Sequence, residues 1–208
     1  MNRTYLGVAF ALLALPLGAY WLLSSSGPSH VTNYPSSGVD IIAFGDSLVV
    51  GVGATKGQDF VSLLQNKVGQ PIANLGVGGN TTADGLSRLG QLDAYRPKVV
   101  LLLLGGNDYL RKVPPEETFA NLARIIEDIQ GRGAIVVLLG VRGGLLSDKY
   151  DERYEALAES YRTAYVSDVL DGLFGRSQYM SDHIHPNDAG YAIIADRIAP
   201  VLAPLIKP

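Results

Sequence analysis

Residues 99–108 read Val-Val-Leu-Leu-Leu-Leu-Gly-Gly-Asn-Asp, an apolar run that ends in two glycines and two polar residues. Six consecutive apolar residues fit a strand that is covered on both faces. Such strands are typical of parallel sheets, because the helices that connect parallel strands lie against both faces. The polar residues that follow this strand mark the edge of the sheet where functional loops are expected to gather.

Similar apolar runs alternate with segments of helical periodicity through the rest of the chain. We expect further strands at 39–44, 72–77 and 135–141, and helices at 60–68, 82–92, 116–130, 150–161 and 188–206. This alternation predicts a three-layer α/β/α sandwich with a mainly parallel sheet and short right-handed connections. The 208 residues, 47% of them hydrophobic, suit one such domain, which we place at 39–208.

The N-terminal region, residues 1–26, differs from the rest because Arg3 is followed by an uncharged run to residue 26. Residues 5–23 are long enough to cross a bilayer core, which needs roughly 20 apolar residues in a helix. We favour an uncleaved signal anchor, since the apolar region of a cleaved signal peptide is usually about 7 to 15 residues long. A cleaved signal peptide stays open, and both interpretations predict a periplasmic or other extracytoplasmic enzyme. Residues 27–38, rich in Ser, Pro and Gly, are expected to form a flexible linker.

The charge balance and the absence of cysteine exclude several classes of function. Lys and Arg total 17 against 20 for Asp and Glu, so no broad positive field is available to hold nucleic acid. Without cysteine the chain can have no disulfide, no thiolate nucleophile and no thiolate metal site. Any catalytic group must therefore act through oxygen or nitrogen.

Three loops after predicted strands carry candidate catalytic groups. Ser47, in Gly-Asp-Ser-Leu at 45–48, lies between a strand end and a helix start, which exposes its hydroxyl at the sheet edge and directs its N–H toward developing negative charge. Gly79 can offer a backbone N–H, and Asn107 a side-chain amide, to the same oxyanion. Each of these residues is also common in ordinary turns and helix caps, so only their combination is informative.

A serine nucleophile needs a base, and the chain contains only three histidines, His30, His183 and His185. His30 falls in the expected linker. Asp182 precedes His185 by three residues and can orient its ring, and we prefer His185 to His183 because a proline follows it and starts the last helix. Two alternatives remain: Asp182 is a helix cap beside surface histidines, or His183 and His185 ligate a metal. No further ligand cluster completes a metal site, so we expect neither a metal nor a cofactor.

Taken together, these residues resemble the GDSL, or SGNH, hydrolases over nearly all of 39–208. The matching blocks are 45–48, 74–81, 105–108 and 182–186. The resemblance implies a flavodoxin-like fold of about five strands, a monomer and a covalent acyl-enzyme mechanism. It further implies that Ser47 is the nucleophile, that Asp182 and His185 are the acid and base, and that Ser47, Gly79 and Asn107 form the oxyanion hole.

The substrate implied by the resemblance is a small acyl ester or thioester, of the arylesterase, lysophospholipase or acyl-CoA thioesterase type. Pro114, Pro115 and residues 142–146 lie on loops at the same sheet edge and are candidates to line an apolar acyl groove. A carbohydrate or peptidoglycan O-acetylesterase with the same triad is an alternative. A membrane-tethered binding protein on an inactive hydrolase scaffold is an alternative from another class.

Overall fold

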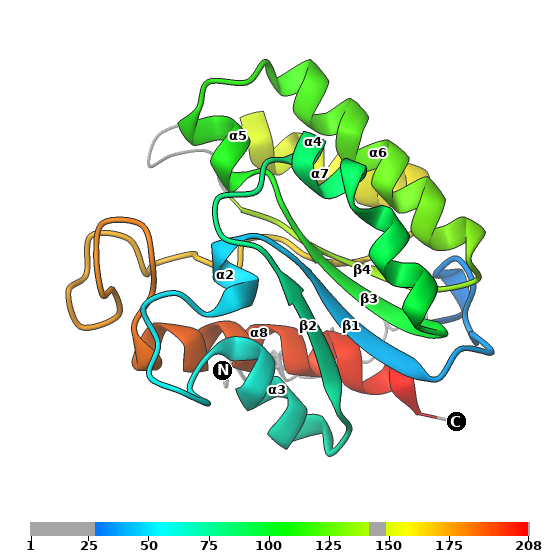
Figure 1. Ribbon diagram of the computed structural model, residues 1–208, viewed down its shortest axis with the longest axis horizontal. Coiled ribbons are helices and arrows are strands. Elements are labelled where there is room, and N and C mark those ends of the chain that lie inside the picture. Colours follow the sequence, from blue (N-terminus) through cyan, green and yellow to red (C-terminus); the bar gives the residue numbers. More distant parts are fainter. Residues whose placement is uncertain (1–27, 142–148, 208) are drawn as a thin grey trace, which may run out of the picture.

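The computed structural model describes residues 28–141 and 149–207, and the expected membrane segment at 5–23 lies outside them. Five strands form one sheet in the order β2-β1-β3-β4-β5, with every neighbouring pair parallel (Figure 1). This sheet confirms the predicted fold class. The strands are β1 (Asp40–Gly45), β2 (Ile72–Gly76), β3 (Pro97–Leu103), β4 (Ile135–Leu139) and β5 (Ala164–Val166).

Helices cover both faces of the sheet, with α3 and α8 on one side and α4, α6 and α7 on the other (Figure 1). The short helices α2 and α5 follow the carboxyl ends of β1 and β3. Two 3-10 helices, η1 (Pro28–His30) and η2 (Leu89–Ala94), complete the described elements. The α-helices are α2 (Ser47–Val50), α3 (Phe60–Val68), α4 (Thr82–Ser87), α5 (Gly106–Leu110), α6 (Pro115–Gly131), α7 (Lys149–Tyr161) and α8 (Asp188–Ile206).

The apolar run that begins at Val99 supplies both hydrophobic cores, because successive side chains of a strand point to opposite faces. Leu101 and Leu103 belong to the core beneath α3 and α8, while Leu102 and Leu104 belong to the core beneath α6 and α7. All four leucines are at most 1% exposed. A polar residue at any of these positions would be buried, which explains why the run contains none.

Helix α8 has the length and composition of a membrane span, and among the described residues it is the one helix that does. Its buried residues include Tyr191, Ile194 and Ile198, which pack in the same core as Leu101. The apolar character of α8 is therefore explained by its position against the sheet.

Residues 28–38 differ from the expected flexible linker, because they pack against the domain. Val31 is buried, and the Asn33 side-chain amide donates to the carbonyls of Gln130 and Ala134 at 2.8 and 2.9 Å. The Ser36 hydroxyl donates to the carbonyl of Gly133 at 2.7 Å. Small polar side chains are common in linkers, but here they satisfy carbonyl groups in the last turn of α6 and in the connection from α6 to β4.

The strand order places the functional edge of the sheet at the boundary between β1 and β3. After β1 the chain forms β2 on one side of β1. After β3 it forms β4 on the opposite side of the sheet's centre. In parallel sheets the crevice outside the strand ends at such a switch point is the usual ligand site. Ser47 lies two residues beyond the end of β1, and Asn107 lies four residues beyond the end of β3.

Candidate active site

Ser47 is the first residue of α2 and stands at an abrupt change from strand to helix. The preceding residue, Asp46, is the N-cap, and its Oδ1 accepts a hydrogen bond from the Leu48 N–H at 3.0 Å. This cap fixes the first turn of α2 against the end of β1. The Ser47 hydroxyl is thereby presented at the carboxyl edge of the sheet.

The structure brings Ser47, His185 and Asp182 together, although Ser47 and His185 are 138 residues apart in the chain. The Nε2 atom of His185 lies 3.1 Å from Ser47 Oγ, and its Nδ1 atom lies 2.8 Å from Asp182 Oδ2. The other oxygen of Asp182, Oδ1, accepts the backbone N–H groups of Ile184 and His185, both at 2.7 Å. The three-residue spacing therefore closes a loop in which one carboxylate fixes both the backbone and the ring of His185.

The hydrogen bond from the His185 ring, together with the two backbone N–H groups, holds the pKa of Asp182 well below its ordinary value. The carboxylate is therefore charged at neutral pH and favours the tautomer of His185 that is protonated on Nδ1. That tautomer leaves the lone pair of Nε2 facing Ser47 Oγ, as proton abstraction requires.

His183, the competing base, has an exposed side chain. Within the described part of the chain, its ring forms no hydrogen bond with Ser47 or Asp182. The alternative of a metal held by His183 and His185 also lacks a site, since among residues 28–141 and 149–207 no group of three or more His, Asp and Glu side chains could hold an ion. Among the described histidines, His185 is the one whose ring lies within hydrogen-bond distance of Ser47 Oγ.

Gly79 lies in a tight turn beside the end of β1. The turn is closed by the Asn80 N–H donating to the Val77 carbonyl at 3.2 Å, and the Val77 N–H donates to Gly45 at 3.0 Å. Gly79 has a φ of 78°, in the left-handed region that favours glycine. Arg111 donates to the Gly79 carbonyl at 2.7 Å, which holds the turn from the side of α5.

Asn107, on α5, connects the loops that carry Gly79 and Ser47. Its side-chain Nδ2 donates to the Asn80 carbonyl at 3.0 Å and to Asp46 Oδ2 at 3.3 Å. Burial raises the pKa of Asp46 to about 6. Sequence reasoning did not identify the Asp46 side chain or Asn80 as functional. Both residues lie within the recognised motifs, but their contacts with Asn107 depend on how three loops pack together.

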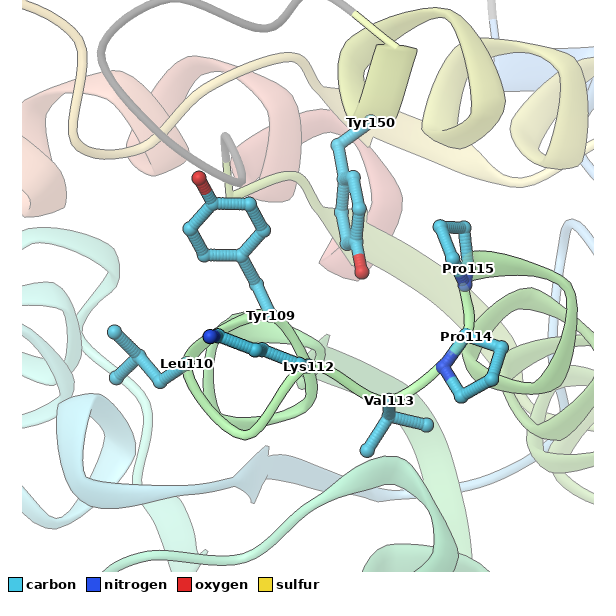
Figure 2. Close-up of a pocket in the computed structure, with 7 residues that line it drawn as sticks. All are labelled: Tyr109, Leu110, Lys112, Val113, Pro114, Pro115 and Tyr150. Atoms are coloured by element: carbon cyan, nitrogen blue, oxygen red, sulfur yellow. The ribbon is translucent and has the colours of Figure 1, made fainter.

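Tyr109 and Leu110 of α5 line a pocket of about 520 Å³ (Figure 2). The rings of Tyr109 and Tyr150 pack edge to face, with their centroids 5.6 Å apart. Pro114 and Pro115, two of the residues expected to line an acyl groove, are part of the wall, whereas residues 142–146 lie outside the described residues. The lining consists of Tyr109, Leu110, Lys112, Val113, Pro114, Pro115 and Tyr150.

Comparison with known proteins agrees with this arrangement. The model of the GDSL-like lipase/acylhydrolase family matches residues 43–193, which contain every residue of the site. The chain belongs to this family. It is accordingly a carboxylic ester hydrolase, and the resemblance predicted from the four motifs is confirmed.

Curated relatives within the family are similar along most of their length. Esterase TesA of Pseudomonas aeruginosa is 32% identical, with 80% of this chain and 89% of the relative covered. Thioesterase 1/protease 1/lysophospholipase L1 of Escherichia coli is 30% identical, with 80% and 85% covered.

Solved structures of the family share the fold. The crystal structure of TesA has a TM-score of 0.74 at 31% identity, covering 80% of this chain and 99% of that one. The SGNH-hydrolase family esterase AlinE4 has a TM-score of 0.64 at 34% identity, covering 81% and 97%.

Proposed function

We propose that this chain hydrolyses acyl esters and thioesters by two-step acyl transfer, with Ser47 as nucleophile, His185 as base and Asp182 as the orienting acid. The observation that carries the proposal is the continuous hydrogen-bonded path from Ser47 Oγ through the His185 ring to Asp182, with distances of 3.1 and 2.8 Å. A hydroxyl becomes an effective nucleophile when a base is placed in this way.

In the first step, Nε2 of His185 takes the Ser47 proton while Oγ bonds to the substrate carbonyl carbon. The tetrahedral intermediate expels the alkoxide or thiolate, which receives that proton from His185 and leaves an acyl-Ser47 ester. In the second step water attacks the same carbon, His185 accepts a proton from the water, and the acid is released as the proton returns to Ser47 Oγ. No cofactor is required by this balance.

The negative oxygen of the intermediate is stabilised by the Ser47 N–H, the Gly79 N–H and the Asn107 amide. Both hydrogens of that amide already have acceptors, so the oxyanion must share or replace one of them. The 3.3 Å contact with Asp46 is the longer of the two and is the one we expect to yield, while the contact with Asn80 keeps the amide in place. Loss of one oxyanion donor typically costs about 2.7 to 4 kcal/mol of transition-state stabilisation.

The surroundings of the site favour an acyl chain longer than acetyl. The pocket lined by Tyr109, Leu110 and Tyr150 is largely apolar and can hold such a chain. Several of the exposed large hydrophobic side chains also lie within three residues of Ser47, Gly79, Asn107 or His185. They are Val50, Val77, Tyr109, Leu110 and Ile184.

The test of the mechanism is Ser47→Ala. We expect the variant to lose turnover of a p-nitrophenyl ester and covalent labelling by a fluorophosphonate probe, with an unchanged circular dichroism spectrum. Wild-type protein that fails to react with the probe would identify the inactive binding scaffold instead. Retained hydrolysis by the alanine variant would discard Ser47 as the nucleophile.

A panel of acetyl, octanoyl and palmitoyl p-nitrophenyl esters, acyl-CoA, lysophospholipid and acetylated sugar tests the substrate class. We expect kcat/KM to rise from acetyl to medium chains. Cleavage of acetylated sugar with no activity on longer chains would point to the O-acetylesterase alternative and refute the acyl-chain assignment.

We also infer that the enzyme is exported across the cytoplasmic membrane, from the uncharged run at 5–23 and the basic residue before it. Fractionation of cells that express the full-length chain is expected to place the activity in the membrane or the periplasm. Activity confined to the cytosol would contradict export.

A further inference from the structure

The side chain of Arg88 contacts the ends of two strands and the loop that carries Gly79. Helix α4 stops at Ser87, and from the junction with η2 the guanidinium reaches back over the sheet edge. Its Nη2 donates to the Gly45 carbonyl at 2.7 Å, its Nη1 to the Leu75 carbonyl at 2.9 Å, and its Nε to Asn80 Oδ1 at 2.7 Å. Gly45 ends β1, and Leu75 lies one residue before the end of β2.

The orientation of the guanidinium plane is also fixed, by an aromatic ring beneath it. Its central carbon lies 3.9 Å from the centroid of the ring of Phe44, which is fully buried, so the cation rests on an aromatic face. Nη1 donates further to Gln91 at 3.1 Å. Three donor nitrogens in a rigid fork, stacked on a ring, leave the group little freedom of movement.

Two partners of Arg88, Gly45 and Asn80, lead to the proposed oxyanion donors. Gly45 is two residues before Ser47 in the chain. Asn80 follows Gly79, and the Asn80 carbonyl accepts from the amide of Asn107 at 3.0 Å. One cation therefore contacts the segments that carry Ser47 and Gly79 and, through Asn80, the hydrogen-bond acceptor of the Asn107 amide.

We propose that Arg88 is the positioning residue of the oxyanion hole: it holds the loops of Ser47, Gly79 and Asn107 at the separation that a tetrahedral oxyanion requires. This inference rests on the proposed function. Arg88 acts through Gly45 and Asn80, and it does not take part in the proton transfer between Ser47 and His185. Lysine cannot replace it, since a single ammonium does not reproduce a planar fork of three donors.

The proposal predicts a specific kinetic signature for Arg88→Met. Oxyanion donors act mainly in the transition state, so kcat should fall by about 10- to 100-fold while KM stays within about threefold. The acidic limb of the pH–rate profile should keep its midpoint, because the base is untouched. Arg88→Lys should recover less than a third of the lost activity.

The matched control is Arg197→Met. Arg197 also donates two hydrogen bonds to backbone carbonyls, those of Val169 and Asp171, at 2.8 and 2.7 Å, and it lies on α8, outside the site. A merely structural role for Arg88 predicts that both variants lower the melting temperature and that neither changes kcat of the folded enzyme. The proposed role predicts that only Arg88→Met lowers kcat.

The experiment measures kcat, KM, pH profile and thermal melting on full-length wild type, Arg88→Met, Arg88→Lys, Arg197→Met and Ser47→Ala. Wild-type kcat in folded Arg88→Met, or an equal fall in Arg197→Met, overturns the positioning role and leaves the proposed function intact. Activity in Ser47→Ala overturns the proposed function itself.

If Arg88→Met does not fold, the side chain of Asn80 carries the test. Asn80→Ala removes the acceptor of Arg88 Nε but keeps the carbonyl that binds Asn107, whereas Asn80→Asp keeps both. We expect the alanine variant to lose about 3- to 10-fold in kcat and the aspartate variant to lose less. The reverse order, or no loss in the alanine variant, refutes the link between Arg88 and the oxyanion loops.

Discussion

Replacement of Asp182 by asparagine should damage catalysis through the tautomer of His185. The Oδ1 atom of Asp182 accepts two backbone N–H groups, from Ile184 and His185, and Oδ2 faces the ring nitrogen Nδ1. In Asp182→Asn the carbonyl oxygen must stay on the two N–H groups, because a flipped amide would set its NH2 against both of them. The NH2 group then faces Nδ1 and donates to it, so the proton of the ring moves to Nε2.

The size of the effect follows from that geometry. Flipping the amide to rescue the tautomer would break two backbone hydrogen bonds, each worth about 0.5 to 1.5 kcal/mol, in order to restore one. The variant should therefore carry its ring proton on Nε2, facing Ser47. A protonated Nε2 cannot accept the proton of the Ser47 hydroxyl. The comparable change in a Ser-His-Asp protease lowers kcat by about 10⁴, which corresponds to about 5.4 kcal/mol at 1.36 kcal/mol for each factor of ten.

The assay is kcat on a p-nitrophenyl ester at pH 8, with Asp182→Ala as the comparison. The Asp182 side chain is 53% exposed, so water can solvate the freed N–H groups in the alanine variant and the ring can choose its own tautomer. We therefore expect the alanine variant to be faster than the asparagine variant. An asparagine variant within tenfold of wild type would refute the proposed role of Asp182.

Two predictions concern stability. Burial raises the pKa of Asp46 from 3.8 to about 6, so the contribution of this group to folding is complete below pH 3.8 and is lost as the pH rises through about 6. At 1.36 kcal/mol per pKa unit the loss is about 3 kcal/mol. We therefore expect the difference in urea-unfolding free energy, Asp46→Asn minus wild type, to rise by about that much between pH 4 and pH 8. A difference that stays constant with pH would contradict the burial argument. Gly105 has a φ of 118°, and a Cβ there would lie 2.2 Å from the hydroxyl of Tyr154. Gly105→Ala should lower stability by about 2 to 4 kcal/mol, seen as a melting temperature several degrees lower, and an unchanged melting curve would rule out the clash.

Helices and strands with a strong local pattern could be predicted from the sequence, whereas short or interrupted ones could not. Phe60–Val68 and Asp188–Ile206 form the expected helices without a change of bounds. The expected helix at 82–92 instead ends at Ser87, and a 3-10 helix begins at Leu89. Arg88, between them, donates hydrogen bonds to the Gly45 and Leu75 carbonyls at the sheet edge. Strand β5 was not located, because three residues with a half-buried Tyr165 in the middle carry too little periodicity.

The amino-acid sequence by itself determined the layers of the fold and the loops that bear polar groups, since hydrophobic periodicity is a property of neighbouring residues. Tertiary structure alone decided that the His185 ring lies 3.1 Å from Ser47 Oγ, that Asp46 and Asn80 share the amide of Asn107, and that Arg88 donates to Gly45 and Asn80. Those contacts join residues tens to more than a hundred positions apart. Their distances depend on how the crossover helices pack against the sheet, and no local pattern records that packing.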